Sequence, residues 1–109
     1  MDAVALLRLV SEATRHAILD ELRGGERTVG QLVEALADEQ TNVSHHLATL
    51  REAGLVSARR DGRNQVYRLA DAEVAKVLAQ VEALAARLEE LAYTNSLGLP
   101  LDAGFHGYG

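Results

Sequence analysis

Residues 42–56 read NVSHHLATLREAGLV, and this stretch decides the fold. Its apolar residues recur at the three- and four-residue intervals that place side chains on one face of an α-helix. These residues are Val43, Leu47 and Leu50. A glycine at position 54 is typical of the residue just after a helix, because glycine takes the left-handed conformation there without steric cost. The stretch therefore predicts a helix over about 41–53 that ends before Gly54.

Three further helices are predicted upstream of this one. Apolar residues at helical spacing indicate helices over 2–10 and 12–23, with Ser11 as the N-cap between them. A third helix is expected to start at Thr28, because Gln31 follows at the spacing of a capping box. A polar break separates this third helix from the helix quoted above. A helix, a short turn and a second helix in this order are typical of a helix-turn-helix.

Downstream of Gly54 the pattern changes period. Residues 55–60 and 65–69 have the composition and alternation of two strands, and residues 61–64 between them carry a turn signal. Together they predict one β-hairpin. A long helix is expected to follow from Asp71, as N-cap, to about residue 93.

The predicted architecture is mainly α with a β-hairpin wing, that is, a winged helix-turn-helix. We assign it to residues 1–94 and treat residues 95–109, which hold four of the nine glycines and the only proline, as a C-terminal tail. No stretch approaches the roughly 20 apolar residues of a membrane span, and the N-terminus lacks the layout of a signal peptide. We therefore expect a cytoplasmic protein. The absence of cysteine excludes disulfides and thiolate metal sites.

The net charge of -5 argues at first against a nucleic-acid partner. The distribution of charge along the chain reverses that judgement. Residues 41–70 carry five arginines against two acids, a net charge of +3, whereas residues 1–40 and residues 71–109 carry -4 each. Positive charge is thus concentrated in the helix and hairpin that a DNA backbone would contact.

Short polar side chains gather at the start of the helix over 41–53, and further polar groups lie at the hairpin tip. Such side chains can reach base edges or phosphates in a major groove. Each feature alone would also fit a solvated helix start or turn, but their conjunction directly after a helix and a short turn favours a DNA interface. The candidate DNA-binding residues are Gln40, Thr41, Asn42, Ser44, His45, Arg60, Arg63 and Asn64.

The last predicted helix carries apolar residues at alternating three- and four-residue intervals, a narrow seam suited to pairing with another helix. The alternative is an amphipathic helix that packs on its own domain. We favour a dimer through the terminal helices, because the preceding elements already make a closed small domain. The candidate interface residues are Leu6, Leu9, Val74, Val77, Val81, Leu84, Leu88 and Leu91.

The run Ser-x-His-Leu-x-x-Leu-x-x-Ala-Gly-Leu-Val at 44–56 resembles the ArsR/SmtB family of bacterial repressors. The stretches TRHAIL at 14–19 and RRDGRNQVYRL at 59–69 add to the resemblance, which covers about residues 5–92. It implies a homodimeric winged-helix protein that binds an inverted-repeat operator in double-stranded DNA. It also implies an effector, often a metal ion, that releases the protein from DNA.

Position by position, the resemblance implies that Thr41, Ser44 and His45 face DNA from the recognition helix. Gln40 would lie at the start of that helix, and Arg63 in the wing. One departure concerns Asp38 and Glu39, which occupy the turn where the family usually has an apolar residue and a serine. Glu39 near a phosphate would weaken binding, although an acid at a helix N-terminus is itself favourable.

The family's metal site on the C-terminal helix is largely lost in this chain. By resemblance, Asp71 matches its first ligand, but Glu73, Leu84 and Arg87 stand where the other ligands would be. Imidazole and carboxylate ligands alone would suit nickel, zinc or cobalt. Helix-start acids, a surface histidine and a disordered tail are the competing interpretations. The candidate ligands are His106, His16, Asp71 and Glu73.

The sequence thus predicts a homodimeric, sequence-specific DNA-binding regulator of repressor type that responds to a divalent metal. The alternatives are a regulator without its own metal site that acts through a partner protein or a small ligand, and a protein-interaction adaptor. An enzyme is not expected, because the chain has no cysteine, no Gly-rich phosphate loop and no compact His/Asp/Ser arrangement.

Overall fold

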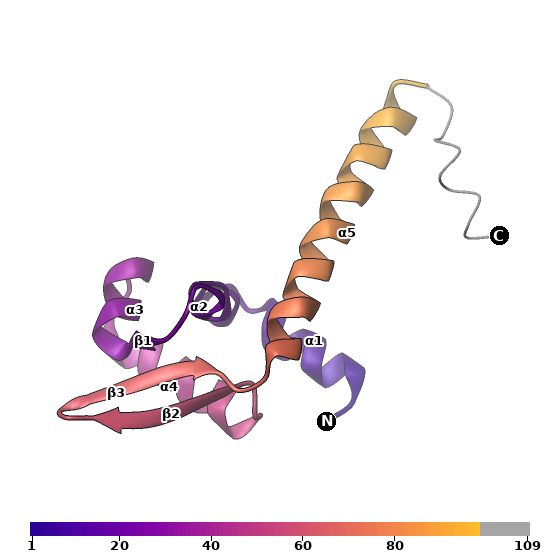
Figure 1. Ribbon diagram of the computed structural model, residues 1–109. Helices are drawn as coiled ribbons and strands as arrows, with labels where there is room; N and C mark the ends of the chain where they lie inside the picture. Colours follow the sequence, from indigo (N-terminus) through magenta and orange to yellow (C-terminus); the bar gives the residue numbers. More distant parts are fainter. Residues whose placement is uncertain (99–109) are drawn as a thin grey trace. The chain divides into compact units, whose positions relative to one another are not determined.

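The computed structural model describes residues 1–98 and divides the chain into two compact units, Met1–Ala75 and Lys76–Gly109. Figure 1 shows the order of the elements along the described chain. They are α1 (Ala3–Ser11), α2 (Ala13–Arg23), β1 (Arg27–Thr28), α3 (Val29–Leu36), α4 (Gln40–Glu52), β2 (Val56–Asp61), β3 (Asn64–Leu69) and α5 (Ala72–Ser96). None of these helices combines the length and apolar character needed to cross a membrane.

The start of α2 differs from the prediction that Ser11 is its N-cap. Ser11 is the last residue of α1, and its hydroxyl donates to the carbonyl of Arg8 at 3.0 Å. Glu12 caps α2 instead, because its carboxylate accepts the backbone N–H of Arg15 at 2.8 Å. The negative charge of a carboxylate at this position also interacts favourably with the helix dipole, whereas a neutral hydroxyl has no charge to make this interaction.

The capping box predicted at the start of α3 is confirmed. The Thr28 hydroxyl accepts the backbone N–H of Gln31 at 3.1 Å, and the Gln31 side chain accepts the backbone N–H of Thr28 at 2.8 Å. Thr28 also ends β1, so the same residue closes a strand and opens a helix. Two otherwise free backbone donors are satisfied at the entry to the helix-turn-helix.

Helix α4 starts one residue earlier than predicted, at Gln40, and ends as expected near Gly54. Gly54 has φ +84°, and its backbone N–H donates to the carbonyl of Arg51 at 3.0 Å. The N–H of Leu55 reaches back to the carbonyl of Leu50 at 3.0 Å. This pair of bonds ends the helix sharply and directs the chain into β2.

The sheet has three strands in the order β1-β3-β2, with both pairings antiparallel. The predicted hairpin is confirmed, and its two-residue turn places Gly62 at φ +62°. The sequence does not predict the edge strand β1, because two residues are too short to show an alternating pattern. It pairs with the middle of β3 and ties the α2–α3 connection to the wing.

The core of the Met1–Ala75 unit lies where α2, α3 and α4 pack against one another. The three residues that predicted α4 are all fully buried, together with partners from the other two helices. The fully buried set is Ile18, Leu19, Leu32, Val43, Leu47 and Leu50. Buried Val56 and Val66 attach the sheet to these helices.

Helix α5 begins as predicted, because the Asp71 carboxylate accepts the backbone N–H of Glu73 at 2.9 Å. It continues to Ser96, beyond the predicted end near residue 93, and Gly98 follows it with φ +71°. Residues 95 and 96, assigned to the tail from the sequence, are therefore helical. The polar Thr94 and Asn95 hid the last turn from an apolar pattern, although the Thr94 hydroxyl donates within the helix to the carbonyl of Glu90.

The contribution of the buried face of α4 to the fold can be measured as a change in the free energy of unfolding. Leu47 is fully buried, so Leu47→Ala is expected to lower the free energy of unfolding by about 2–5 kcal/mol. Urea denaturation at fixed protein concentration measures the change, with Glu34→Ala on the exposed surface of α3 as the control. A decrease no larger than that of the control would show that α4 is not anchored through this face.

Candidate nucleic-acid interface

Helix α4 turns one face to the core and the opposite face to solvent. Because its apolar residues are buried, the side chains between them on the helical circumference point outward. Most of the residues predicted to contact DNA from this helix are exposed: Gln40, Thr41, Ser44 and His45. They lie in the N-terminal half of α4, where free backbone N–H groups favour an approaching phosphate.

Asn42 differs from these four residues. It is half-buried, and its amide Nδ2 donates to Asp38 Oδ2 at 2.7 Å. Asp38 Oδ1 accepts the backbone N–H of Glu39 at 2.7 Å. The Asn42 amide, followed by the Glu39 backbone, holds the pKa of the Asp38 carboxyl below its usual value. Asn42 and Asp38 thus hold the turn between α3 and α4.

His46 points to the scaffold, unlike its neighbour His45. Its Nδ1 lies 3.2 Å from Nη1 of Arg15 and 3.7 Å from Oε2 of Glu12. Arg15 in turn donates from Nε to the carbonyl of Leu9 at 2.6 Å. One chain of polar contacts therefore joins α4 to the corner between α1 and α2, and leaves His45 as the solvent-facing histidine of the pair.

The wing sorts its side chains onto two faces, because cross-strand partners share a face and successive residues alternate. One face carries Ser57, Arg59, Val66 and Arg68, and the other carries Ala58, Arg60, Gln65 and Tyr67. On the first face the arginines are engaged. Arg59 donates to Glu26 Oε2 at 2.7 Å, and Arg68 donates to the Ser57 hydroxyl at 3.1 Å.

The cations of the second face and of the turn differ from those of the first face in having no partner among the described residues. Arg60 and Arg63 are exposed, and neither has an ion pair or side-chain hydrogen bond within residues 1–98. By contrast, the hydrogen bond from Arg59 lowers the pKa of the Glu26 carboxyl, which stays charged and neutralises that arginine. Asn64 is also exposed and pairs with Asp61 across the hairpin end. The wing thus offers positive charge to a ligand on one side and at its tip.

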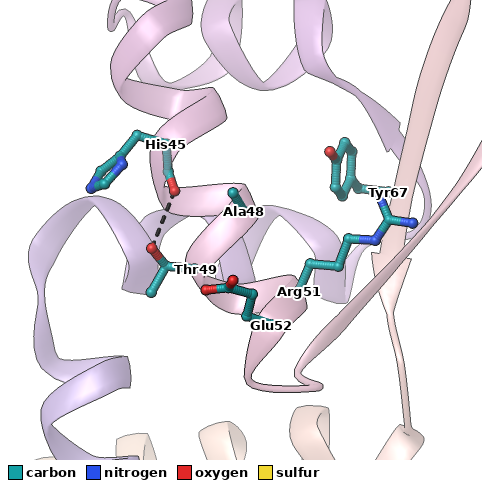
Figure 2. Close-up of a pocket in the computed structure, with 6 residues that line it drawn as sticks. All are labelled: His45, Ala48, Thr49, Arg51, Glu52 and Tyr67. Atoms are coloured by element: carbon teal, nitrogen blue, oxygen red, sulfur yellow. Dashed lines mark hydrogen bonds between the residues drawn. The ribbon is translucent and has the colours of Figure 1, made fainter.

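A groove of about 550 Å³ lies between α4 and β3 (Figure 2). Its lining consists of His45, Ala48, Thr49, Arg51, Glu52 and Tyr67. Arg51 and Tyr67 are not among the residues predicted from the sequence. Helical spacing could have found Arg51, because it follows Ser44 by seven residues and therefore shares its exposed face. Tyr67 could not be found in this way, because its position depends on how the sheet packs.

The predicted metal ligands are not brought together in the described part of the chain. No group of three or more His, Asp or Glu side chains among residues 1–98 has an arrangement that can hold a metal ion. Asp71 caps α5 through the backbone of Glu73, and His16 is half-buried on α2. His106 lies outside the described residues. A metal site stays a prediction.

Helix α5 presents an exposed apolar seam. Its members Val77, Val81, Leu84 and Leu88 are 47% to 55% exposed. Val74 and Leu91, at the two ends of the predicted seam, are half-buried, as are Leu6 and Leu9 on α1. On α1 the strongly exposed apolar residues are instead Val4 and Leu7, at 58% and 59%, which were not predicted as interface residues.

Comparison with known proteins agrees with this geometry. A family model described as the bacterial regulatory protein, arsR family, matches residues 12–58. The HTH-type transcriptional repressor SmtB of Mycobacterium tuberculosis is 44% identical over 73 residues, which are 67% of this chain and 54% of that protein. This chain therefore spans about half the length of that relative. The M. tuberculosis regulator Rv0081 is 35% identical over 82 residues, 74% of this chain and 72% of that protein.

Solved structures show the same fold. The crystal structure of M. tuberculosis Rv0081 has a TM-score of 0.77 at 30% identity, and covers 85% of this chain and 99% of that chain. The solution structure of a homodimeric winged helix-turn-helix DNA-binding domain from Mycobacterium bovis has a TM-score of 0.68 at 37% identity, and covers 80% of this chain and 87% of that chain. The predicted winged helix-turn-helix is confirmed, and the chain belongs to the ArsR/SmtB family of transcriptional regulators.

Proposed function

We propose that this chain works as a homodimer that binds an inverted-repeat operator in double-stranded DNA and represses transcription. The observation that carries the proposal is the combination of exposed polar side chains at the start of α4 with Arg60 and Arg63 of the wing, which have no side-chain partner within residues 1–98. The name of the relative SmtB, a transcriptional repressor, supports the direction of regulation. With DNA as its partner, the protein is expected to work in the bacterial cytoplasm.

On this proposal α4 is the recognition helix. Hydroxyl, amide and imidazole groups can donate to and accept from base edges, and the major groove presents a different pattern of such groups for each base pair. Ser44 and His45 are exposed on the outer face of α4 and are the residues expected to read bases. Arg60 and Arg63 supply charge for phosphates, which sets affinity and register but not sequence.

The exposed seam on α5 supports a dimer. Four large apolar side chains remain about half exposed on one helix, and burying each one against a partner would stabilise the pair by about 1.5–3 kcal/mol at most. The homodimeric M. bovis domain provides a precedent among similar structures. A two-fold axis relates two recognition helices, so the matching DNA is an inverted repeat with half-sites about 10–10.5 bp apart or a multiple of that distance.

The assignment of the recognition helix is tested by Ser44→Ala combined with His45→Ala. Removal of these groups is expected to abolish discrimination between operator and random DNA, because each good base contact contributes about 1–3 kcal/mol. Gel-shift titration measures both affinities, and size-exclusion chromatography checks that the oligomeric state is unchanged. Ser11→Ala, which removes a hydroxyl bonded only within α1, is the control. Operator affinity equal to wild type would contradict the assignment.

The two faces of the wing are tested by a matched pair of double variants. Arg60→Ala with Arg63→Ala should weaken binding and make its salt dependence shallower, by about 0.9 in slope for each phosphate that is no longer neutralised. Arg59→Ala with Arg68→Ala removes the same charge from the opposite face of the wing, where Arg59 is paired with the Glu26 carboxylate and Arg68 is hydrogen-bonded to the Ser57 hydroxyl. A clearly smaller change is expected for that variant, and equal changes in slope would refute the assignment of the faces.

The dimer is tested by Leu84→Asp, which introduces a charge into the seam. Light scattering after size-exclusion chromatography should show a monomer, and operator affinity should fall because the two half-sites are no longer bound together. Ala86→Asp puts the same charge on the opposite side of α5 and should leave the dimer intact. A dimer that persists in Leu84→Asp would rule out α5 pairing through this seam.

A further inference from the structure

The groove between α4 and β3 has two polar groups that the structure leaves without partners. The Arg51 guanidinium and the Tyr67 hydroxyl both belong to lining residues, and neither makes a hydrogen bond or ion pair within residues 1–98. In Figure 2 the Arg51 side chain extends from α4 toward Tyr67, and the Tyr67 hydroxyl points back toward the helix. Two donors from separate elements thus line one concave surface.

The groove continues the surface that carries the proposed DNA contacts. Along α4, Ser44, Ala48 and Arg51 follow at four- and three-residue intervals and share one exposed face. Along the sheet, Tyr67 lies on the same face as Arg60, whereas the engaged Arg59 lies on the other. The groove therefore lies between the outer face of α4 and the free face of the wing.

A DNA backbone that passes between a recognition helix and a wing brings phosphate oxygens, which are acceptors with negative charge. A guanidinium supplies planar, permanently charged donors for such an oxygen, and a phenol supplies a neutral donor with little conformational freedom. We propose, building on the proposed function, that this groove holds a backbone phosphate of the operator, with Arg51 and Tyr67 as its donors.

Glu52 also lines the groove and opposes this role, because its carboxylate repels a phosphate. Its side chain is exposed, so solvent and salt screen part of this repulsion and leave the rest. Glu52 thus limits the affinity of the groove for a phosphate. Replacing it with a neutral isostere should therefore strengthen binding, and a gain in affinity cannot result from misfolding.

The test uses the full chain and a duplex selected by the wild-type protein from a random pool. Tyr67→Phe should weaken binding at least 10-fold, as expected when a hydrogen bond to a charged acceptor is removed. Arg51→Gln should weaken binding at least 10-fold and lower the salt slope by about 0.9 for each subunit. Glu52→Gln should tighten binding. Arg59→Gln, on the opposite face of the wing, is the matched control.

A scan with single methylphosphonates locates the phosphate. Neutralising one particular phosphate in each half-site should weaken binding by the wild type. On the duplex with that neutral phosphate, Arg51→Gln and Tyr67→Phe should bind with the same affinity as the wild type, because the contact that they lack is already absent. Two results would overturn the phosphate site while the proposed function stands. In the first, each variant binds more weakly than the wild type by the same factor on every duplex of the scan. In the second, both variants bind the unmodified duplex as tightly as the wild type does. If the wild-type protein selects no duplex from the random pool, the proposed function and the phosphate site are both contradicted.

Discussion

Burial of one face of α4 is the constraint on which the rest of the structure depends. Val43, Leu47 and Leu50 are fully buried where α4 packs against α2 and α3, so the rotation of α4 about its own axis is fixed. With that rotation fixed, Ser44, His45 and Arg51 point outward. Disruption of the buried face would therefore remove the interface as well as the core.

Pairing of charges then selects which part of the basic segment can meet DNA. The chain carries a net charge of -5, and its positive segment would be weak as a binding surface if its arginines were all neutralised internally. Instead Glu26 engages Arg59 on one face of the wing, while Arg60 on the other face and Arg63 at the tip stay free within residues 1–98. The fold thus neutralises Arg59 on one face of the hairpin and leaves Arg60 and Arg63 available on the other face and at the tip.

The helices, the hairpin and the polar start of α4 could be predicted from the sequence, because each follows from local periodicity, capping and turn chemistry. Features that depend on tertiary contacts could not be predicted from the sequence. The strand β1 exists only through its pairing with β3. Tyr67 enters the site because the sheet packs beside α4, which no local pattern reveals.

The central claim is that α4 and the free face of the wing form one DNA-binding surface. It is tested most directly by adding operator duplex to isotope-labelled protein and following every backbone amide by NMR. We predict that the largest shifts fall on residues 40–52 and 58–67, with small and indirect shifts along residues 77–96. Shifts centred on α5 or α1, with α4 and the wing unchanged, would contradict it.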